Sequence, residues 1–220
     1  MIFSEILVFF YHPTQIIFLI YQIRLQYVSK LFYKNAFKSL TTFNMSAVPN
    51  LKRKLTKQKM DCLFFRLSNL NLKGINNNIA SFVLTHSIAE NSHFEHISKL
   101  ASLTHVNLAM SNHISDGVLP YLASLTNLKE LVLNNILING EGLKNLKNFP
   151  HLKYLNIRSH GEVLDALPLV PYLEELYLTH SVSPSKLKNF GKLSALTNLT
   201  ALSIPPKFNY DQLQVIGEYL

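Results

Sequence analysis

Cysteine and glycine are scarce in this sequence of 220 residues, and each scarcity excludes a class of protein. Cys62 is the only cysteine, so no intramolecular disulfide can form and we expect a reducing compartment. Seven glycines leave little material for a glycine-rich phosphate loop, and neither a nucleophile elbow nor a paired-carboxylate cleft can be recognised. We therefore expect a protein that is not an enzyme and holds no cofactor.

Acidic residues are scarce at the N-terminal end only. Residues 1–60 hold nine Lys or Arg and one acid, whereas residues 61–220 hold twelve of each sign. The formal net charge of +8 thus belongs to the first of these segments. Because binding to phosphates needs clustered positive charge along the binding surface, we expect no nucleic acid on residues 61–220, which include the repeats described next.

One apolar pattern occurs six times in a single frame. Successive copies of an apolar-x-x-apolar-x-apolar hexad begin 24, 25, 24, 21 and 26 residues apart. The copies are Ile79-Phe82-Leu84, Leu103-Val106-Leu108, Leu128-Leu131-Leu133, Leu152-Leu155-Ile157, Leu173-Leu176-Leu178 and Leu199-Leu202-Ile204. A period in the twenties is typical of a solenoid. The alternation within each hexad predicts a short strand with one buried face.

The segments between the hexads predict helices. Two neighbouring segments carry apolar residues three apart: Leu119, Leu122 and Leu125, then Leu143, Leu146 and Phe149. Asp116 and Glu141 stand at the helix entrances, where an acidic side chain complements the helix dipole. The repeat that begins at Leu152 has only 21 residues, so we expect a short or 3₁₀ connection at residues 163–167.

This pattern resembles the leucine-rich repeat family over about residues 67–220. The strings Ile114–Leu133 and Ile138–Leu146 are similar to its helical-backed subclass, ribonuclease-inhibitor-like or bacterial. The resemblance implies an α/β solenoid of about six repeats, with a short curved parallel sheet and helices on the convex side. It departs from the family three residues past each strand, where the usual Asn, Cys or Thr is replaced by Ser87, Ser111, Ile136, His160, Ser181 and Lys207. We expect the serines to substitute in part for the usual backbone bond.

Three segments precede the full repeats of residues 79–220. Residues 1–44 form an apolar and aromatic arm, predicted to be α-helical, in which residues 14–40 read as an amphipathic, basic helix. Residues 45–60 read as a basic linker, and residues 61–78 as a degenerate opening repeat or cap. The arm has three interpretations: contact with an anionic membrane, a cap over the first repeat, or a segment upstream of a true start at Met45.

The solvent-facing strand positions predict where a partner binds. The resemblance implies a binding surface on the concave face with no built-in chemistry. Tyr and Arg are enriched among residues that carry binding energy, so Tyr154, Arg158 and Tyr177 are the predicted centre of the site. The full predicted set is His105, Glu130, Tyr154, Asn156, Arg158, Glu175, Tyr177 and His180. Aromatic residues mixed with both charges indicate a protein partner.

The function we expect is that of a non-enzymatic adaptor. His93 and His96 stand one helical turn apart and supply two metal ligands but no third, so no metal site is expected. Lys outnumbers Arg seventeen to four, as in AT-rich genomes, and with family analogy this suggests a bacterial effector. The expected location is cytoplasmic or a host cytosol. The alternative is a membrane-associated peripheral scaffold anchored by residues 14–40; a minor alternative is the substrate-reading subunit of a ubiquitin ligase.

Overall fold

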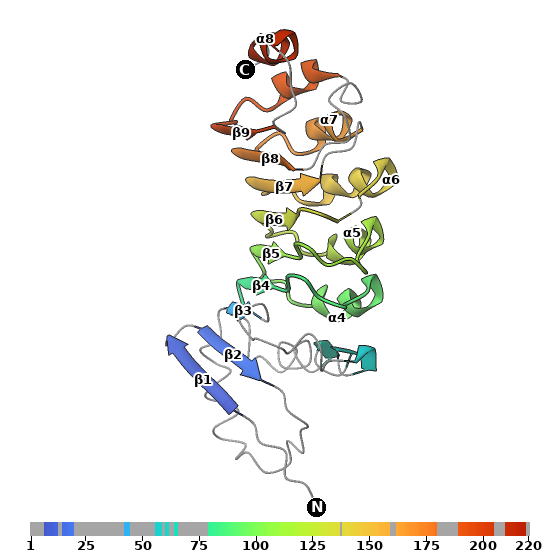
Figure 1. Ribbon diagram of the computed structural model, residues 1–220, viewed down its shortest axis with the longest axis vertical. Helices are drawn as coiled ribbons and strands as arrows, with labels where there is room; N and C mark the ends of the chain where they lie inside the picture. Colours follow the sequence, from blue (N-terminus) through green and yellow to red (C-terminus); the bar gives the residue numbers. More distant parts are fainter. Residues whose placement is uncertain are drawn as a thin grey trace, which may run out of the picture.

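In the part of the chain that the structure describes, nine strands form one sheet and pair in the order in which they follow one another (Figure 1). The structure is a computed structural model. It describes residues 7–12, 15–19, 42–44, 56–58, 60–61, 64–65, 79–136, 138–158, 162–179, 189–204 and 210–218. The first two strands, β1 (Leu7–His12) and β2 (Gln15–Leu19), form an antiparallel hairpin. Every later strand is parallel to the one before it.

The parallel strands stack as a solenoid, one strand per repeat (Figure 1). They are β3 (Thr42–Asn44), β4 (Ser81–Val83), β5 (His105–Asn107), β6 (Glu130–Leu133), β7 (Tyr154–Arg158), β8 (Glu175–Thr179) and β9 (Ala201–Ser203). The last six coincide with the six hexads. Each is entered through one repeated contact, in which the amide of Thr104, Lys129, Lys153, Glu174 or Thr200 donates to a carbonyl of the preceding repeat at 2.8 Å.

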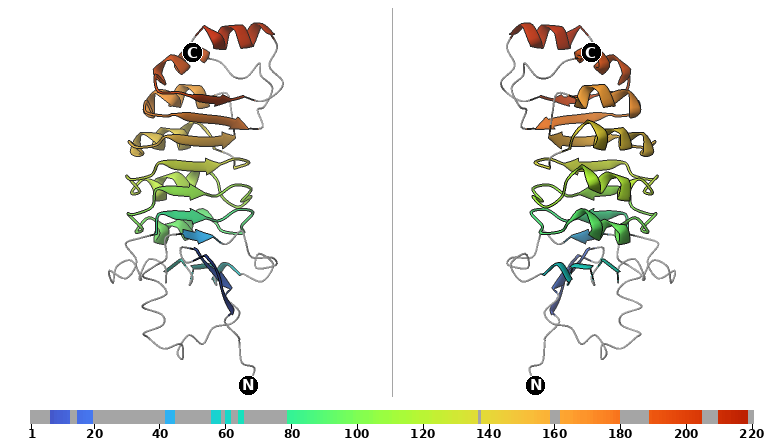
Figure 2. Two further views of the ribbon diagram at one scale, coloured as in Figure 1. Left: turned by 90° about the vertical axis from the view of Figure 1, so that its left-hand side faces the viewer. Right: turned by 90° about the vertical axis from the view of Figure 1, so that its right-hand side faces the viewer.

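The opposite side of the sheet is lined by short helical turns. They are η1 (Asn91–His93), α4 (Phe94–Ile97), η2 (Asp116–Val118), α5 (Leu119–Leu122), α6 (Gly140–Leu143), η3 (Lys144–Asn148), α7 (Val163–Ala166), η4 (Leu167–Leu169) and η6 (Phe190–Ala195). The longer α8 (Tyr210–Gly217) lies at the far end, in red (Figure 2). The short repeat has one α-turn followed by a 3₁₀ turn, as its length predicts. The α-turns of the longer repeats are no longer, because repeats in the twenties leave room for little more.

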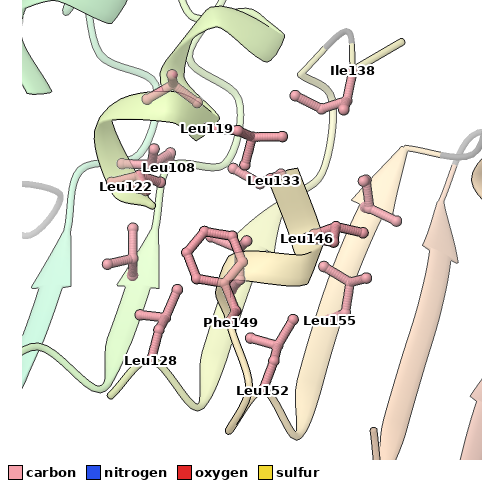
Figure 3. Close-up of a cluster of buried hydrophobic side chains, with 14 of the residues drawn as sticks. Leu108, Leu119, Leu122, Leu128, Leu133, Ile138, Leu146, Phe149, Leu152 and Leu155 are labelled. Atoms are coloured by element: carbon pink, nitrogen blue, oxygen red, sulfur yellow. The ribbon is translucent and has the colours of Figure 1, made fainter. Parts of the chain in front are cut away.

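The hydrophobic core fills the space between sheet and helical turns. Figure 3 shows Phe149 among leucines of neighbouring repeats, including Leu128, Leu146 and Leu155. These four side chains are at most 1% exposed. Burial of each such side chain contributes about 1.5–3 kcal/mol, and no repeat could bury its apolar face without its neighbours.

The serine column behaves as expected. Ser111 is fully buried, and its hydroxyl donates to the carbonyl of Leu84 and accepts from the amide of Ser87, each at 3.1 Å. One side chain thus satisfies two backbone groups of the preceding repeat. The next position in the column, Ile136, is buried and apolar, and its own amide turns back to Leu133 at 3.1 Å. The side-chain bond between repeats therefore stops at Ile136.

The sheet begins one strand earlier than the hexads predict. In β3, Phe43 aligns with Phe82 of β4 and is 1% exposed. Residues 57–58, 60–61 and 64–65 are helical, and Met60 and Phe64 are buried in the core. The predicted boundary at residue 44 therefore divides one strand–helix repeat, and residues 45–60 are not simply a linker. Phe43 was missed because it replaces an aliphatic residue and precedes its partner by 39 residues.

The predicted helix over residues 14–40 is wrong where the structure describes that segment. Gln15–Leu19 is strand β2, paired with β1 on one side and with β3 on the other. A short apolar run does not distinguish a helix from a strand by periodicity, and Ile and Phe favour strands. Residues 20–41 lie outside the described residues. None of the helices in the described ranges is long and apolar enough to cross a bilayer.

Candidate binding face

The side of the sheet opposite the helical turns carries two columns of outward-facing side chains (Figure 2, left). We call this predicted concave surface the sheet face. The register aligns Ser81, His105, Glu130, Tyr154, Glu175 and Ala201 in one column and Val83, Asn107, Val132, Asn156, Tyr177 and Ser203 in the other. All twelve side chains are partly or fully exposed. The positions predicted to face solvent are therefore the positions that do.

Two tyrosines stack at the middle of the sheet face. The rings of Tyr154 on β7 and Tyr177 on β8 have centroids 5.1 Å apart and planes inclined by 30°. The hydroxyl of Tyr177 donates to Oε2 of Glu175 at 3.1 Å. This hydrogen bond and the carboxylate charge raise the pKa of Tyr177 above its usual value. The stack is thus held from one side by a carboxylate on its own strand.

A second carboxylate lies on the other side of Tyr154. Glu130 of β6 aligns with Tyr154, which in turn aligns with Glu175 of β8. Nε2 of His105 lies 3.0 Å from Oε1 of Glu130. Nδ1 of the same imidazole lies 2.6 Å from the hydroxyl of Thr104. The row of side chains that crosses the strands therefore runs histidine, glutamate, tyrosine, glutamate.

Polar groups continue along β7 towards its carboxyl end. Asn156 and Arg158 face outward on the same side as Tyr154. Oδ1 of Asn156 and Nε of Arg158 are shielded from solvent and have no hydrogen-bond partner among the described residues. Arg158 aligns with Thr179, the last residue of β8. His180, the remaining predicted site residue, lies outside the described residues.

The two histidines considered as metal ligands do not form a metal site. Within the described ranges, no group of three His, Cys, Asp or Glu side chains could hold a metal ion. His93 is 2% exposed, and its Nδ1 accepts from the amide of Glu90 at 3.0 Å. Its Nε2 lies 3.3 Å from the carbonyl oxygen of Lys57. His93 therefore connects the helical residues near Lys57 to the first full repeat. Cys62 lies outside the described residues.

Two features of the solenoid were not predicted from the sequence. Three residues at equivalent positions just past the strands have a left-handed backbone, with φ of 51° at His86, 60° at Met110 and 63° at Asn135. Only the asparagine signals this conformation in sequence. A hollow of about 470 Å³ also lies beside β9, lined by residues that include Leu193, Leu196, Leu199 and Leu202. Its sequence signal is the last hexad, whose apolar residues are only partly buried.

Three solved structures are similar to this chain. They are an internalin from Listeria monocytogenes (17% identity, TM-score 0.44), the plant peptide hormone receptor RGFR1 in complex with RGF2 (17%, 0.38) and a leucine-rich repeat protein from Leptospira interrogans (14%, 0.42). The matches cover 84%, 63% and 77% of this chain and 61%, 22% and 50% of the respective other chains. No protein-family model and no curated protein matches the sequence.

Proposed function

The chain folds as a leucine-rich repeat solenoid, and from this premise we propose that it is a binding module that engages a protein partner on the sheet face. The observation that supports the proposal is the Tyr154–Tyr177 stack, which lies on a rigid parallel sheet and faces solvent. Tyrosine offers a large contact area at little cost in conformational entropy, and residues of this kind dominate the energetics of interfaces.

The polar surroundings of the stack favour a protein over other partners. Carboxylates of Glu130 and Glu175 flank it, and a guanidinium, that of Arg158, lies further along β7. Aromatic, acidic and basic groups on one surface suit the varied chemistry of a protein surface. Nucleic acid is disfavoured, because carboxylates beside the stack repel phosphates. The predicted set His105, Glu130, Tyr154, Asn156, Arg158, Glu175, Tyr177 and His180 remains our proposed site.

The biological setting is the finer part of the proposal. We propose a non-enzymatic adaptor of a bacterial effector type, acting in a cytoplasm or host cytosol, on the basis of family analogy and composition. A membrane-associated scaffold is the alternative, and liposome co-sedimentation of the full chain tests it. The described strand at Gln15–Leu19 replaces the first part of the amphipathic helix on which that alternative depends. A substrate-reading role in a ubiquitin ligase remains a minor alternative.

Affinity capture from a eukaryotic cell lysate, with bound proteins identified by mass spectrometry, tests the proposed function. The full chain is the bait, because a bait that starts at Met45 lacks β3. The test variant combines Tyr154→Ala, Arg158→Glu and Tyr177→Ala, and the control is Tyr172→Ala, an exposed tyrosine outside the sheet face. A protein retained by the original chain and the control but lost from the folded test variant supports the proposal. Equal retention by all three contradicts it.

A further inference from the structure

We propose that the sheet face receives a lysine or arginine side chain of its partner, seated on the Tyr154–Tyr177 stack between the carboxylates of Glu130 and Glu175. We define these four residues as the cation seat. The inference rests on the proposed function and adds the chemistry of the group that the partner inserts. The partner it fits is a protein segment with a basic residue exposed at its centre.

The register places the four residues of the cation seat together. Glu130, Tyr154 and Glu175 occupy the same level on three adjacent strands. Neighbouring strands in a sheet lie about 4.8 Å apart, so the two carboxylates are roughly 10 Å apart with the Tyr154 ring between them. Tyr177 stands two residues along β8 from Glu175 and stacks on Tyr154. An elongated cation fits between the two acidic side chains and over the rings.

The aromatic pair adds an attraction that carboxylates alone do not provide. The faces of tyrosine rings are electron-rich and attract ammonium or guanidinium groups within about 6 Å, by roughly 0.5–2 kcal/mol. The hydroxyl of Tyr177 donates to Glu175, which holds the carboxylate at the edge of the stack. Both tyrosines are only partly exposed, so a bound cation would lose part of its water and interact more strongly.

The negative charge of the cation seat is not matched by a lysine or arginine of the chain itself. Among the described residues, the only cationic partner of Glu130 is His105, and Glu175 has no ion pair. The nearby Lys153 pairs instead with Glu174, at 2.5 Å. Arg158 is four residues from Tyr154 along β7, which is about 13 Å in an extended strand. The electrostatic complement of this surface must therefore come from outside.

The experiment that tests the cation seat is selection of random peptides displayed on phage, with the full chain immobilised. Selection is repeated with three double variants: Glu130→Gln with Glu175→Gln, Tyr154→Ala with Tyr177→Ala, and the control Glu141→Gln with Glu218→Gln. The control removes two exposed carboxylates away from the sheet face. Circular dichroism confirms that each variant is folded. Binding of the selected peptides is then measured with synthetic copies, in which each Lys or Arg is replaced in turn by norleucine or citrulline.

The cation seat predicts peptides enriched in Lys or Arg that bind the original chain and the control equally. Loss of the two carboxylates, or of one basic residue of the peptide, should weaken binding by about tenfold or more, as for other paired charges at interfaces. Peptides that depend on the two tyrosines but show no enrichment in basic residues overturn the cation seat and leave the proposed function standing. Peptides indifferent to the tyrosines, or no selection above background, overturn both.

Discussion

Phe43 and Phe82 stack face to face where the solenoid begins, with ring centroids 5.2 Å apart and planes inclined by 15°. Phe64 and Phe94 contact the edge of the Phe82 ring, at 5.6 and 6.3 Å. All four rings are at most 1% exposed. The first repeats are therefore joined by an aromatic cluster in place of the leucines used further along, and such ring pairs add about 0.5–1.5 kcal/mol to simple burial.

Replacing Phe43 by alanine should lower the free energy of unfolding by about 3–5 kcal/mol, because it removes a buried ring and leaves a cavity beside Phe82. Urea denaturation followed by circular dichroism measures the loss. Tyr172→Ala is the matched control: this ring is 61% exposed, so the change should be within about 0.5 kcal/mol. Equal stability of the Phe43 and Tyr172 variants would show that β3 does not contribute to the fold.

The aromatic cluster explains why the start of the sheet was hard to predict. Leu40, Phe43 and Met45 have the spacing of a hexad, but no copy lies 24 residues before Ile79, where the period places one. The apolar run at Ile16–Leu19 raises the opposite problem, because four apolar residues fit a helix and a strand equally well. From Ile79 onwards the hexads repeat closely, and there strands and buried faces follow directly from the sequence.

Ser111→Ala should cost about 1–3 kcal/mol, since it leaves the amide of Ser87 and the carbonyl of Leu84 buried with one bond fewer. Thermal and urea unfolding measure this cost. Ser124→Ala is the control, because its hydroxyl also reaches back to the preceding repeat, bonding the carbonyl of Ser98 at 2.8 Å, but at an exposed site. There water replaces the lost bond and the change should be a few tenths of a kcal/mol. Equal losses in both variants would contradict a special role for burial.

Met110→Gly should raise the free energy of unfolding by about 1 kcal/mol, because a left-handed backbone strains residues that carry a Cβ and is free for glycine. The Met110 side chain is 36% exposed, so little burial is lost. Met110→Ala serves as the control, since it removes the same side chain but keeps the Cβ and the strain. Calorimetric unfolding compares the two variants. If both change stability alike, the left-handed conformation at this position is not strained.

The site was predicted to different depths at different residues. Two-residue alternation within each hexad correctly places Tyr154 and Tyr177 on the sheet face. Their ring contact depends on the register between β7 and β8, which the equal position of both residues relative to their hexads also implies. The shielding of Nε in Arg158 and the bond from Tyr177 to Glu175 depend on side-chain rotamers, which no sequence pattern specifies.

The hydroxyl of Tyr177 should titrate above the ordinary tyrosine pKa of about 10, because the Glu175 carboxylate accepts its proton in a hydrogen bond and repels the phenolate. Since folding raises this pKa, the interaction stabilises the fold fully below pH about 10 and its contribution disappears as the pH rises through the raised value. NMR of tyrosine labelled with ¹³C at Cζ follows the titration, with Tyr177→Phe assigning the resonance. Glu175→Gln should lower the Tyr177 midpoint, whereas the control Glu174→Gln removes a carboxylate that pairs with Lys153 and should leave it unchanged. An unchanged midpoint in the Glu175 variant would mean that this carboxylate does not hold Tyr177 in solution, and the stack would then lack the acidic support on which the cation seat depends.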